Sequence, residues 1–423
     1  MKNTIKMSLA AAVAVSALTT SASAGNLEEM IKGVSASGKM NIEYQNDSND
    51  KVNGVAGDSD NQVEYDLDIT FKIPVNDNIT ATIGFQADHD VDIENAMNTR
   101  ANANGDTTDT QVDVTLANFT YANGPVTVIT GKQNVGTPFL YDQKGDGVVG
   151  LYNAGPVTLA AAHFVNSNAN ILDGVLTNNI PANLSQGAED INAVAVIAPN
   201  IAGSGINASA WYVTTTLGTG TGTGLVEANA EDAEAYTINV NGKIGPVGFD
   251  VRHSSAEVDG NANWEAEELT KVMLTADVDM FSFAAGYGTT NDVMEAGAAQ
   301  SALGLGRTHG VSWDDDDTTE TGFNGEQAYL DTLNDADAFL ISASASFDKF
   351  VVGVTYIDGE ADQDGATGTA GDLDFDELLL NVSYAMSKNF TVSSYYSMFE
   401  VDATGTANDQ ENDELSVKLT YKF

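Results

Sequence analysis

The stretch Val63-Glu-Tyr-Asp-Leu-Asp-Ile-Thr-Phe-Lys-Ile73 alternates apolar and polar residues over eleven positions. After Asn76-Asp77-Asn78 the alternation resumes at Ile79 and continues to Phe85. A period of two is the pattern of a β-strand with one apolar and one polar face. Clusters of Asn and Asp between two such stretches are typical of turns. The segment therefore predicts an antiparallel hairpin with one face in contact with something apolar.

The same alternation recurs to the last residue of the chain. Short turns rich in Gly, Pro, Asn or Asp, such as Gly124-Pro125 and Gly245-Pro246, alternate with long polar connections such as 291–335. Between residues 111 and 216 the alternation is weaker, and we still expect six strands there. In total we expect 18 strands, eight short turns and nine long connections. Further clear alternating stretches begin at Met40, Tyr236, Val272, Phe339, Leu378 and Leu415.

Composition excludes several classes of protein. The 423 residues include 17 Lys plus Arg against 61 Asp plus Glu, a net charge of −44. Nucleic-acid binding needs a cationic face, so that class is excluded. The absence of Cys removes disulfide scaffolds and thiolate metal sites. Because 42% of the residues are hydrophobic, the chain is too apolar to be a disordered acidic segment.

Residues 1–24 have the pattern of a secretory signal peptide. Lys2 and Lys6 precede the apolar stretch Leu9 to Leu18, and Ala22-Ser23-Ala24 supplies small residues for cleavage. The apolar stretch is too short for a membrane-spanning helix, which needs about 20 residues. We expect residues 25–423 to form a single domain, with a helical turn at Leu27 to Gly33 on the periplasmic side.

The fold that fits these patterns is a transmembrane antiparallel up-and-down β-barrel. Eighteen half-apolar strands are more than one soluble sandwich normally carries. Acids such as Glu64, Asp66 and Asp68 would be destabilising in a dry core but not around water. Alternation of short and long connections is typical of outer-membrane barrels, and aromatic residues near strand ends are typical of their interfacial girdles rather than of an ordinary core.

A barrel of this size encloses an aqueous channel. Strand number and a polar inner face therefore predict an outer-membrane channel, which needs no catalytic residue. Because acids greatly outnumber bases, we expect the channel to prefer cations. The alternative is an adhesin or surface-structural barrel that acts through its long extracellular connections.

Several short motifs resemble the major outer-membrane porins of Campylobacter and related bacteria. These motifs are Leu27-Glu28-Glu29, Gly131-Lys132-Gln133, Asp146-Gly147-Val148-Val149-Gly150, Leu159-Ala160-Ala161 and Tyr421-Lys422-Phe423. The resemblance implies a homotrimeric general-diffusion porin of 18 strands, in the outer membrane of a Gram-negative bacterium, for the passive diffusion of ions and small hydrophilic solutes. It also implies that Tyr421 and Phe423 belong to the terminal signal read by the barrel assembly machinery.

The same resemblance implies an inward-folded third loop within Lys132 to Gly150 that narrows the channel. The residues expected at this constriction are Lys132, Asp142, Lys144 and Asp146, opposite wall residues that include Arg252, Lys271, Lys39 and Lys418.

Metal and catalytic sites are weakly indicated. Asp142 and Asp146 match part of a calcium loop, and so do Glu360, Asp362 and Asp364, but neither set completes the motif. We weigh calcium binding there against solvated acidic loops, and expect no other cofactor. The four His residues show no ligand spacing, and Gly304-Leu305-Gly306 lacks the third glycine of a dinucleotide site because His309 stands there. We therefore expect no enzyme.

Overall fold

The computed structural model describes residues 33–52, 55–56, 59–92, 111–137, 144–167, 190–216, 232–258, 266–291, 335–362, 372–404 and 410–423. The expected signal peptide, residues 1–24, lies outside this part of the chain, as does the expected helical turn except for Gly33. Both therefore stay predictions. In the described part, no helix is long and apolar enough to cross a bilayer.

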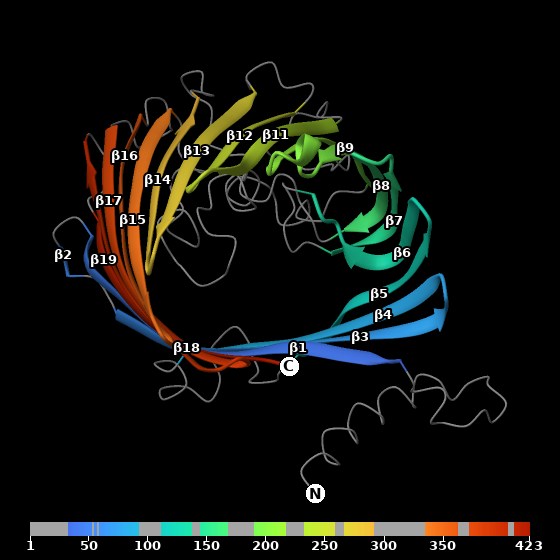
Figure 1. Ribbon diagram of the computed structural model, residues 1–423. Helices are drawn as coiled ribbons and strands as arrows, with labels where there is room; N and C mark the ends of the chain where they lie inside the picture. The colour runs from blue at the N-terminus through green and yellow to red at the C-terminus, as the bar shows by residue number, and fades with distance from the viewer. Residues whose placement is uncertain are drawn as a thin grey trace, which may run out of the picture.

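Eighteen strands form one closed antiparallel wall (Figure 1), as the alternating pattern predicts. Each strand of the wall pairs with the next one along the chain, and β1 also pairs with β19, while the two-residue β2 pairs with β1. The strands are β1 (Ser35–Val52), β2 (Val55–Ala56), β3 (Ser59–Asn76), β4 (Ile79–Asp92), β5 (Gln111–Asn123), β6 (Val126–Asn134), β7 (Lys144–Asn153), β8 (Thr158–Ser167), β9 (Asp190–Ala198), β10 (Ile206–Thr216), β11 (Asp232–Ile244), β12 (Val247–Val258), β13 (Glu267–Val278), β14 (Phe281–Thr290), β15 (Ala336–Phe347), β16 (Phe350–Asp362), β17 (Asp372–Ser387), β18 (Phe390–Ala403) and β19 (Gln410–Lys422).

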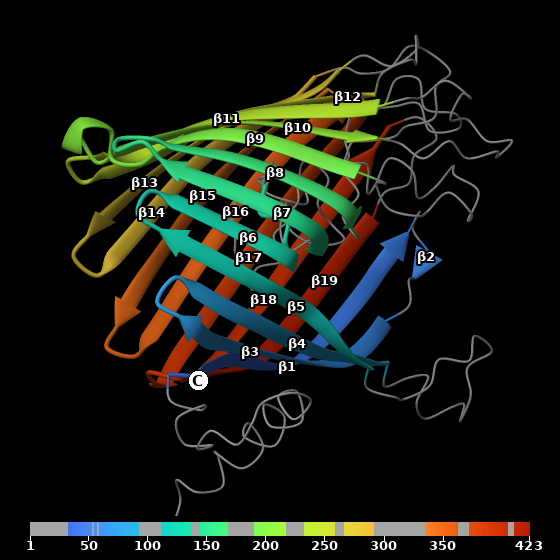
Figure 2. The same cartoon turned by 90° about the vertical axis from the view of Figure 1, so that its right-hand side faces the viewer.

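All eight short turns lie at the end of the barrel where the chain terminates (Figure 2). Gly124 and Gly245 open two of these turns with φ of 56° and 62°, and a proline follows each of them. Positive φ at the first turn position favours glycine, and the next position suits the fixed negative φ of proline. Asp348 opens another turn with φ 54°. Short turns of this kind mark the periplasmic end of an outer-membrane barrel.

The last residue of the chain helps to close the barrel. The amide of Gly38 donates to the carbonyl of Phe423 at 3.0 Å, and the amide of Phe423 donates back to the carbonyl of Gly38 at 3.0 Å. From there β1 and β19 pair in register as far as Asn49 and Asn412. A closed wall leaves no strand edge to be satisfied by solvent or lipid.

The outer face of the wall is apolar and exposed. Ile238, Ile341 and Phe350 are 50%, 57% and 49% exposed. Near the short-turn end the aromatic rings lie close together, with centroids 4.4 Å apart for Phe350 and Tyr384. Exposure of large apolar side chains on this scale fits a face that contacts lipid and not one packed in a core.

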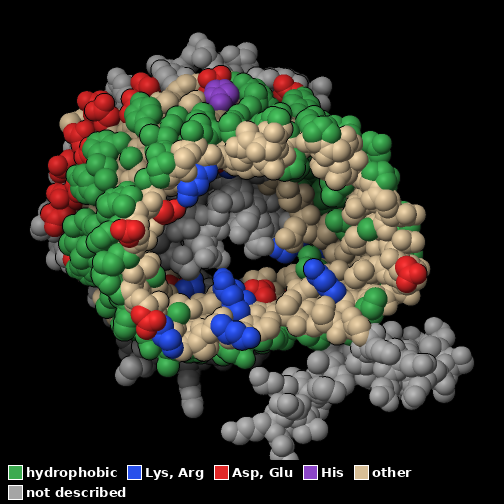
Figure 3. Space-filling view, viewed as in Figure 1, with side chains coloured by type: hydrophobic (Ala, Val, Ile, Leu, Met, Phe, Trp, Pro, Cys, Tyr) green, Lys and Arg blue, Asp and Glu red, His purple; other side chains and the backbone are tan. Residues whose placement is uncertain are grey.

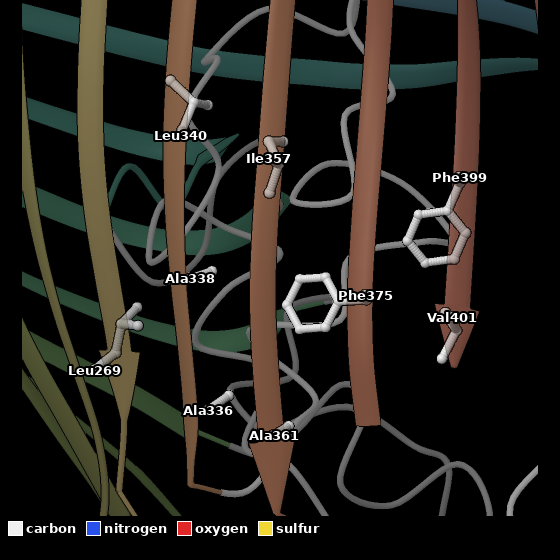
Figure 4. Packing of buried hydrophobic residues seen from close by; sticks show 9 residues of the cluster. All are labelled: Leu269, Ala336, Ala338, Leu340, Ile357, Ala361, Phe375, Phe399 and Val401. Atoms are coloured by element: carbon white, nitrogen blue, oxygen red, sulfur yellow. The ribbon is translucent and has the colours of Figure 1, made fainter. Parts of the chain in front are cut away.

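The inner face is different at its two ends. Toward the long connections, β13 and β15 to β18 carry buried apolar residues that we call the inner apolar patch (Figure 4). Toward the short turns the inward positions are polar, for example Ser342 and Thr355, whose hydroxyls are 3.0 Å apart. The inner apolar patch consists of Leu269, Ala336, Ala338, Leu340, Ile357, Ala361, Phe375, Phe399 and Val401.

Candidate pore lining

The inward positions of β1 and β19 hold a buried ion pair. The ammonium Nζ of Lys418 lies 2.9 Å from Oε2 of Glu43, and the two side chains are only 7% and 9% exposed. The hydroxyl of Ser416 donates to the other carboxylate oxygen of Glu43. One position further along, the hydroxyl of Thr420 donates to Oδ1 of Asn41 at 3.0 Å. The seam between the first and last strands is therefore joined by side chains as well as by backbone pairing.

An acidic ladder follows on the next strand. Glu64, Asp66 and Asp68 of β3 stand directly opposite Glu43, Asn41 and Lys39 of β1. Opposite positions in an antiparallel pair share a face of the sheet, so all three acids face the lumen. The amide of Asn41 donates to Oδ2 of Asp66 at 3.4 Å. We call Glu64, Asp66 and Asp68 the acidic ladder.

A basic pair lies on another part of the wall. Arg252 of β12 stands directly opposite Lys271 of β13, which is 7% exposed. Asn239 of β11 stands opposite Arg252 on the other side, and its amide donates to Oδ1 of Asp250 at 2.9 Å. Arg252 and Lys271 share the inward face with the buried Ser254 and Leu269. We call Arg252 and Lys271 the basic pair.

The two groups belong to opposite sides of the channel. In Figure 1, β1 and β3 form the lower wall while β12 and β13 form the upper wall. The space-filling view shows Lys and Arg side chains on both sides of the opening and Asp or Glu beside those of the lower wall (Figure 3). Ions that cross the barrel therefore pass between a wall of mixed charge, rich in acids, and a wall that presents two adjacent cations.

The residues expected in the third loop are placed differently. Strand β7 begins at Lys144 and not after Gly150, so the connection from β6 is shorter than expected and comprises residues 135–143. Lys132 of β6 stands opposite Asp146 of β7. The next pair along the two strands is the buried Gln133 and Gly145. Lys132 and Asp146 therefore lie on the opposite strand face from Gln133. They also belong to a different part of the wall from the basic pair on β12 and β13.

The start of this connection is buried. Val135 and Thr137 are 4% and 3% exposed, and the amide of Gln133 donates to the carbonyl of Gly147 at 3.2 Å. Asp142 lies outside the described residues. An inward-folded third loop with Asp142 at a constriction thus stays a prediction.

The calcium prediction is not resolved by the described residues. Asp142, Asp364 and the side chain of Asp362 fall outside them, while Glu360 is exposed on β16. Within the described ranges, no group of three or more His, Asp or Glu side chains is arranged to hold a metal ion. Calcium binding at either partial motif remains a prediction.

Sequence reasoning missed the part of Glu43 in the pore lining. The alternation around Met40 assigned Glu43 to the polar face. Its pairing with Lys418 depends on the register between two strands at opposite ends of the chain, which no local pattern encodes. The first and last strands of any closed barrel pair with each other. Which residue of β19 stands opposite Glu43 depends on the register and could not be predicted.

The comparisons with known proteins agree with the geometry. A family model described as Campylobacter major outer membrane protein matches residues 1–423, the whole chain. No curated protein matches the sequence. Among solved structures, OccK5 (OpdH) of Pseudomonas aeruginosa has a TM-score of 0.63 at 12% identity, covering 93% of this chain and 99% of its own. OccK3 (OpdO) of the same species has a TM-score of 0.60 at 14% identity, with coverage of 94% and 97%. OccAB4 of Acinetobacter baumannii has a TM-score of 0.61 at 12% identity, with coverage of 92% and 98%. At these identities the structural similarity concerns the fold.

Proposed function

Because this chain belongs to the Campylobacter major outer membrane protein family and is an outer-membrane porin channel, we propose that its pore prefers cations. The wall contacts membrane lipid, and small solutes pass through the lumen. The fold is that of a channel, and we expect it to have no catalytic role.

The observation that carries the proposal is the acidic ladder. Glu64, Asp66 and Asp68 all face the lumen. Of the two cations nearby, Lys39 stands opposite Asp68, and Lys418 lies 2.9 Å from Glu43. Electrostatic screening lengths are about 8 to 10 Å in dilute saline, so charges on the wall act on ions well inside the lumen. The acidic wall concentrates cations along β1 and β3, while the basic pair repels them from the far wall.

The test is the reversal potential of single channels in planar bilayers under a KCl gradient. We expect the sign that indicates K⁺ preference, and we expect the triple variant Glu64→Gln, Asp66→Asn, Asp68→Asn to lose most of it. The matched control is Asp402→Asn, which removes a carboxylate from the outer face of β18 and should leave the potential unchanged. Chloride preference in the unaltered protein, or an unchanged potential in the triple variant, would contradict the proposal. Stepwise currents from purified protein also separate this channel from a pure adhesin.

We further propose that the protein is a homotrimer. Support comes from the family, since the resemblance noted in the sequence implies this state. The mass of the protein–detergent complex, measured by size-exclusion chromatography with light scattering, should correspond to three chains, each of 44.3 kDa before removal of the expected signal peptide. The detergent must keep the barrel folded, which is checked by the change in its mobility on a gel after heating. A monomeric mass under those conditions would contradict this proposal.

We also propose that Tyr421 and Phe423 are read by the barrel assembly machinery. Their rings stack with centroids 5.9 Å apart on the outer face of the last strand. The variant Phe423→Ala keeps the backbone pair with Gly38, so refolding in detergent micelles should be nearly normal while assembly in cells falls severalfold. Equal losses in micelles and in cells would indicate a structural role alone.

A further inference from the structure

The outward face of β6 to β9 carries charged and polar side chains. Lys132 of β6 and Asp146 of β7 stand directly opposite each other, on the strand face that also presents Val148, which is 47% exposed. His163 of β8 stands opposite Val148, and its Nδ1 lies 2.9 Å from Oδ1 of Asn192 on β9. Because opposite residues of antiparallel strands share a face, these side chains all lie on the outside of the barrel. We call Lys132, Asp146, His163 and Asn192 the outer polar row.

The apolar part of the outer face is lower on these strands than on others. On β5, the outward Val112 and Val114 lie nearer the long connections than Ala117, the residue that stands opposite Lys132. Val112 and Val114 are 63% and 45% exposed. On β15, the outward Phe339 likewise lies further from its short turn than Lys132 lies from the turn before β6. If lipid surrounded the whole barrel evenly, the outer polar row would therefore stand in hydrocarbon.

Hydrocarbon is an unfavourable surrounding for the outer polar row. Charged side chains on the lipid face of a barrel are destabilising to an extent that rises with depth. Ionisable groups within a membrane generally face protein or a water-filled space. A lysine can extend its long side chain toward the interface, but the shorter side chains of Asp146 and Asn192 cannot reach as far. The outer polar row therefore indicates that protein, and not lipid, covers β6 to β9.

A second copy of the same chain fits this surface by its charge. Lys132 and Asp146 have opposite signs and stand on adjacent strands, which are about 4.8 Å apart. Copies related by a closed symmetry present the same surface to their common axis. Charges of both signs would then alternate around a three-fold axis, and each Lys132 could approach Asp146 of the next copy. The exposed apolar side chains Val148 and Tyr152 of β7 supply the hydrophobic part of such a contact.

The opposite side of the barrel is less suited to contact between copies. Asp358, Asp376 and Glu400 stand in one line across β16, β17 and β18 on the outer face. All three are acids, so two copies that met there would place like charges together, which is unfavourable. Figure 1 shows β16 and β17 on the left of the barrel and β6 to β8 on the right. In Figure 2, β5 to β9 lie side by side on the wall that faces the viewer.

We propose that the outward face of β6 to β9 is the surface through which copies of this chain contact one another, with the outer polar row enclosed between them. The inference rests on the proposed homotrimer and goes beyond it, because it names the strands and side chains that meet. It places Lys132 and Asp146 between subunits, outside the lumen. The outer face of β15 to β19 then remains in contact with lipid.

The first test uses the absence of cysteine from the sequence. Val148→Cys places one thiol on the outer face of β7, and a short bis-maleimide should link two copies of the folded protein in detergent. The matched control is Ile341→Cys, at a side chain that is 57% exposed on β15. On a denaturing gel we expect at least severalfold more linked dimer from Val148→Cys. Equal yields from the two variants would overturn the proposal.

Light scattering on the same preparations separates this inference from the homotrimer itself. A mass of three chains without a link at position 148 would overturn the proposed contact and leave the homotrimer standing. A monomeric mass for the unaltered, folded protein would contradict the homotrimer and the proposed contact together.

The second test reverses the charges of the outer polar row. Lys132→Glu should lower the fraction of trimer severalfold, because acids would then meet around the axis. The exchange Lys132→Glu with Asp146→Lys should restore the trimer. The control is Lys349→Glu, in the short turn between β15 and β16, which should leave the fraction of trimer unchanged.

Each variant is first checked for a folded barrel by the change in its gel mobility on heating, so that loss of trimer is measured on folded protein. An unchanged fraction of trimer in folded Lys132→Glu would overturn the proposal. So would an exchange variant that is as dissociated as Lys132→Glu alone.

Discussion

At the scale of single residues, Gly38 is constrained by the end of the chain. A Cβ atom at this position would lie 2.5 Å from Cζ of Phe423 and 2.4 Å from the carbonyl oxygen of Asp68. Real Cβ atoms do not make non-bonded contacts that short, so a side chain here must displace the terminal ring or the neighbouring strand. The residue that closes the barrel therefore depends on a glycine almost 400 positions earlier.

We predict that Gly38→Val destabilises the barrel by forcing Phe423 away from β1. The expected result is a lower temperature at which the heat-modifiable band converts on a gel. Gly150→Ala serves as the control, because a Cβ there meets its nearest atom, the carbonyl oxygen of Ala161, at 3.9 Å. Equal conversion temperatures for Gly38→Val and the unaltered protein would contradict the prediction.

The ion pair between Lys418 and Glu43 leads to a second prediction. Breaking a buried pair by removing one partner typically costs about 3 to 5 kcal/mol, whereas replacing both partners costs much less. Lys418→Met should therefore lower the free energy of unfolding in urea more than the double variant Lys418→Met, Glu43→Leu. A double variant that is less stable than Lys418→Met by a similar further amount would show that the pair is not coupled.

Residue roles were predictable only as far as alternation reaches. Arg252 and Lys271 were expected on the channel wall from the resemblance, and the structure shows that they stand directly opposite each other. Their role at a constriction stays a prediction. Lys132 and Asp146 were expected from the resemblance alone, and their strand face could not be known until the start of β7 was fixed.

At the scale of elements, β15 to β19 carry rows of acids on the outer face near the long connections. Asp337, Glu360, Asp374 and Asp402 stand opposite one another across four strands. A second row crosses β16 to β19. The hydroxyl of Tyr287 donates to Asp337 at the level where the apolar outer face ends. The second row consists of Asp358, Asp376, Glu400 and Glu411.

Like charges directly opposite in a sheet are destabilising. We predict that Asp376→Asn stabilises the protein by about 0.5 to 1 kcal/mol, since it removes a carboxylate between Asp358 and Glu400. The gain should shrink as NaCl rises, because salt screens exposed charges. Asp77→Asn, in the turn before β4, is the control and should have little effect. A lower unfolding temperature for Asp376→Asn at low salt would contradict the prediction.

Elements were the best predicted level. The 18 strands and eight short turns follow from a period of two and from Gly, Pro, Asn and Asp, which act locally. Strand ends were less certain. The bulge between Asp146 and Gly147 and the early start of β7 depend on pairing with β8, which is not a local property.

At the scale of the whole molecule, ion preference should depend on salt. Screening shortens from about 10 Å at 0.1 M to about 3 Å at 1 M. We predict that the K⁺ to Cl⁻ permeability ratio, measured from reversal potentials, falls toward one over this range. The triple variant of the acidic ladder should change little over the same range. A ratio that is independent of salt would indicate selection by size or direct binding.

The barrel as a whole was predictable because strand number and alternating connection length determine the architecture. The burial of the inward face near the long connections was not predictable. Ala338 and Leu340 alternate with the outward Phe339 and Ile341, so this stretch of β15 is apolar on both sides and alternation does not distinguish its buried face.

The pairing of β1 with β19 has a consequence for biosynthesis. The earliest strand to leave the ribosome must keep one hydrogen-bonding side unsatisfied until the very last residues have been translated and exported. A chain that lacks the last strand would therefore form an open sheet with two unpaired strand edges, which periplasmic chaperones and proteases would bind.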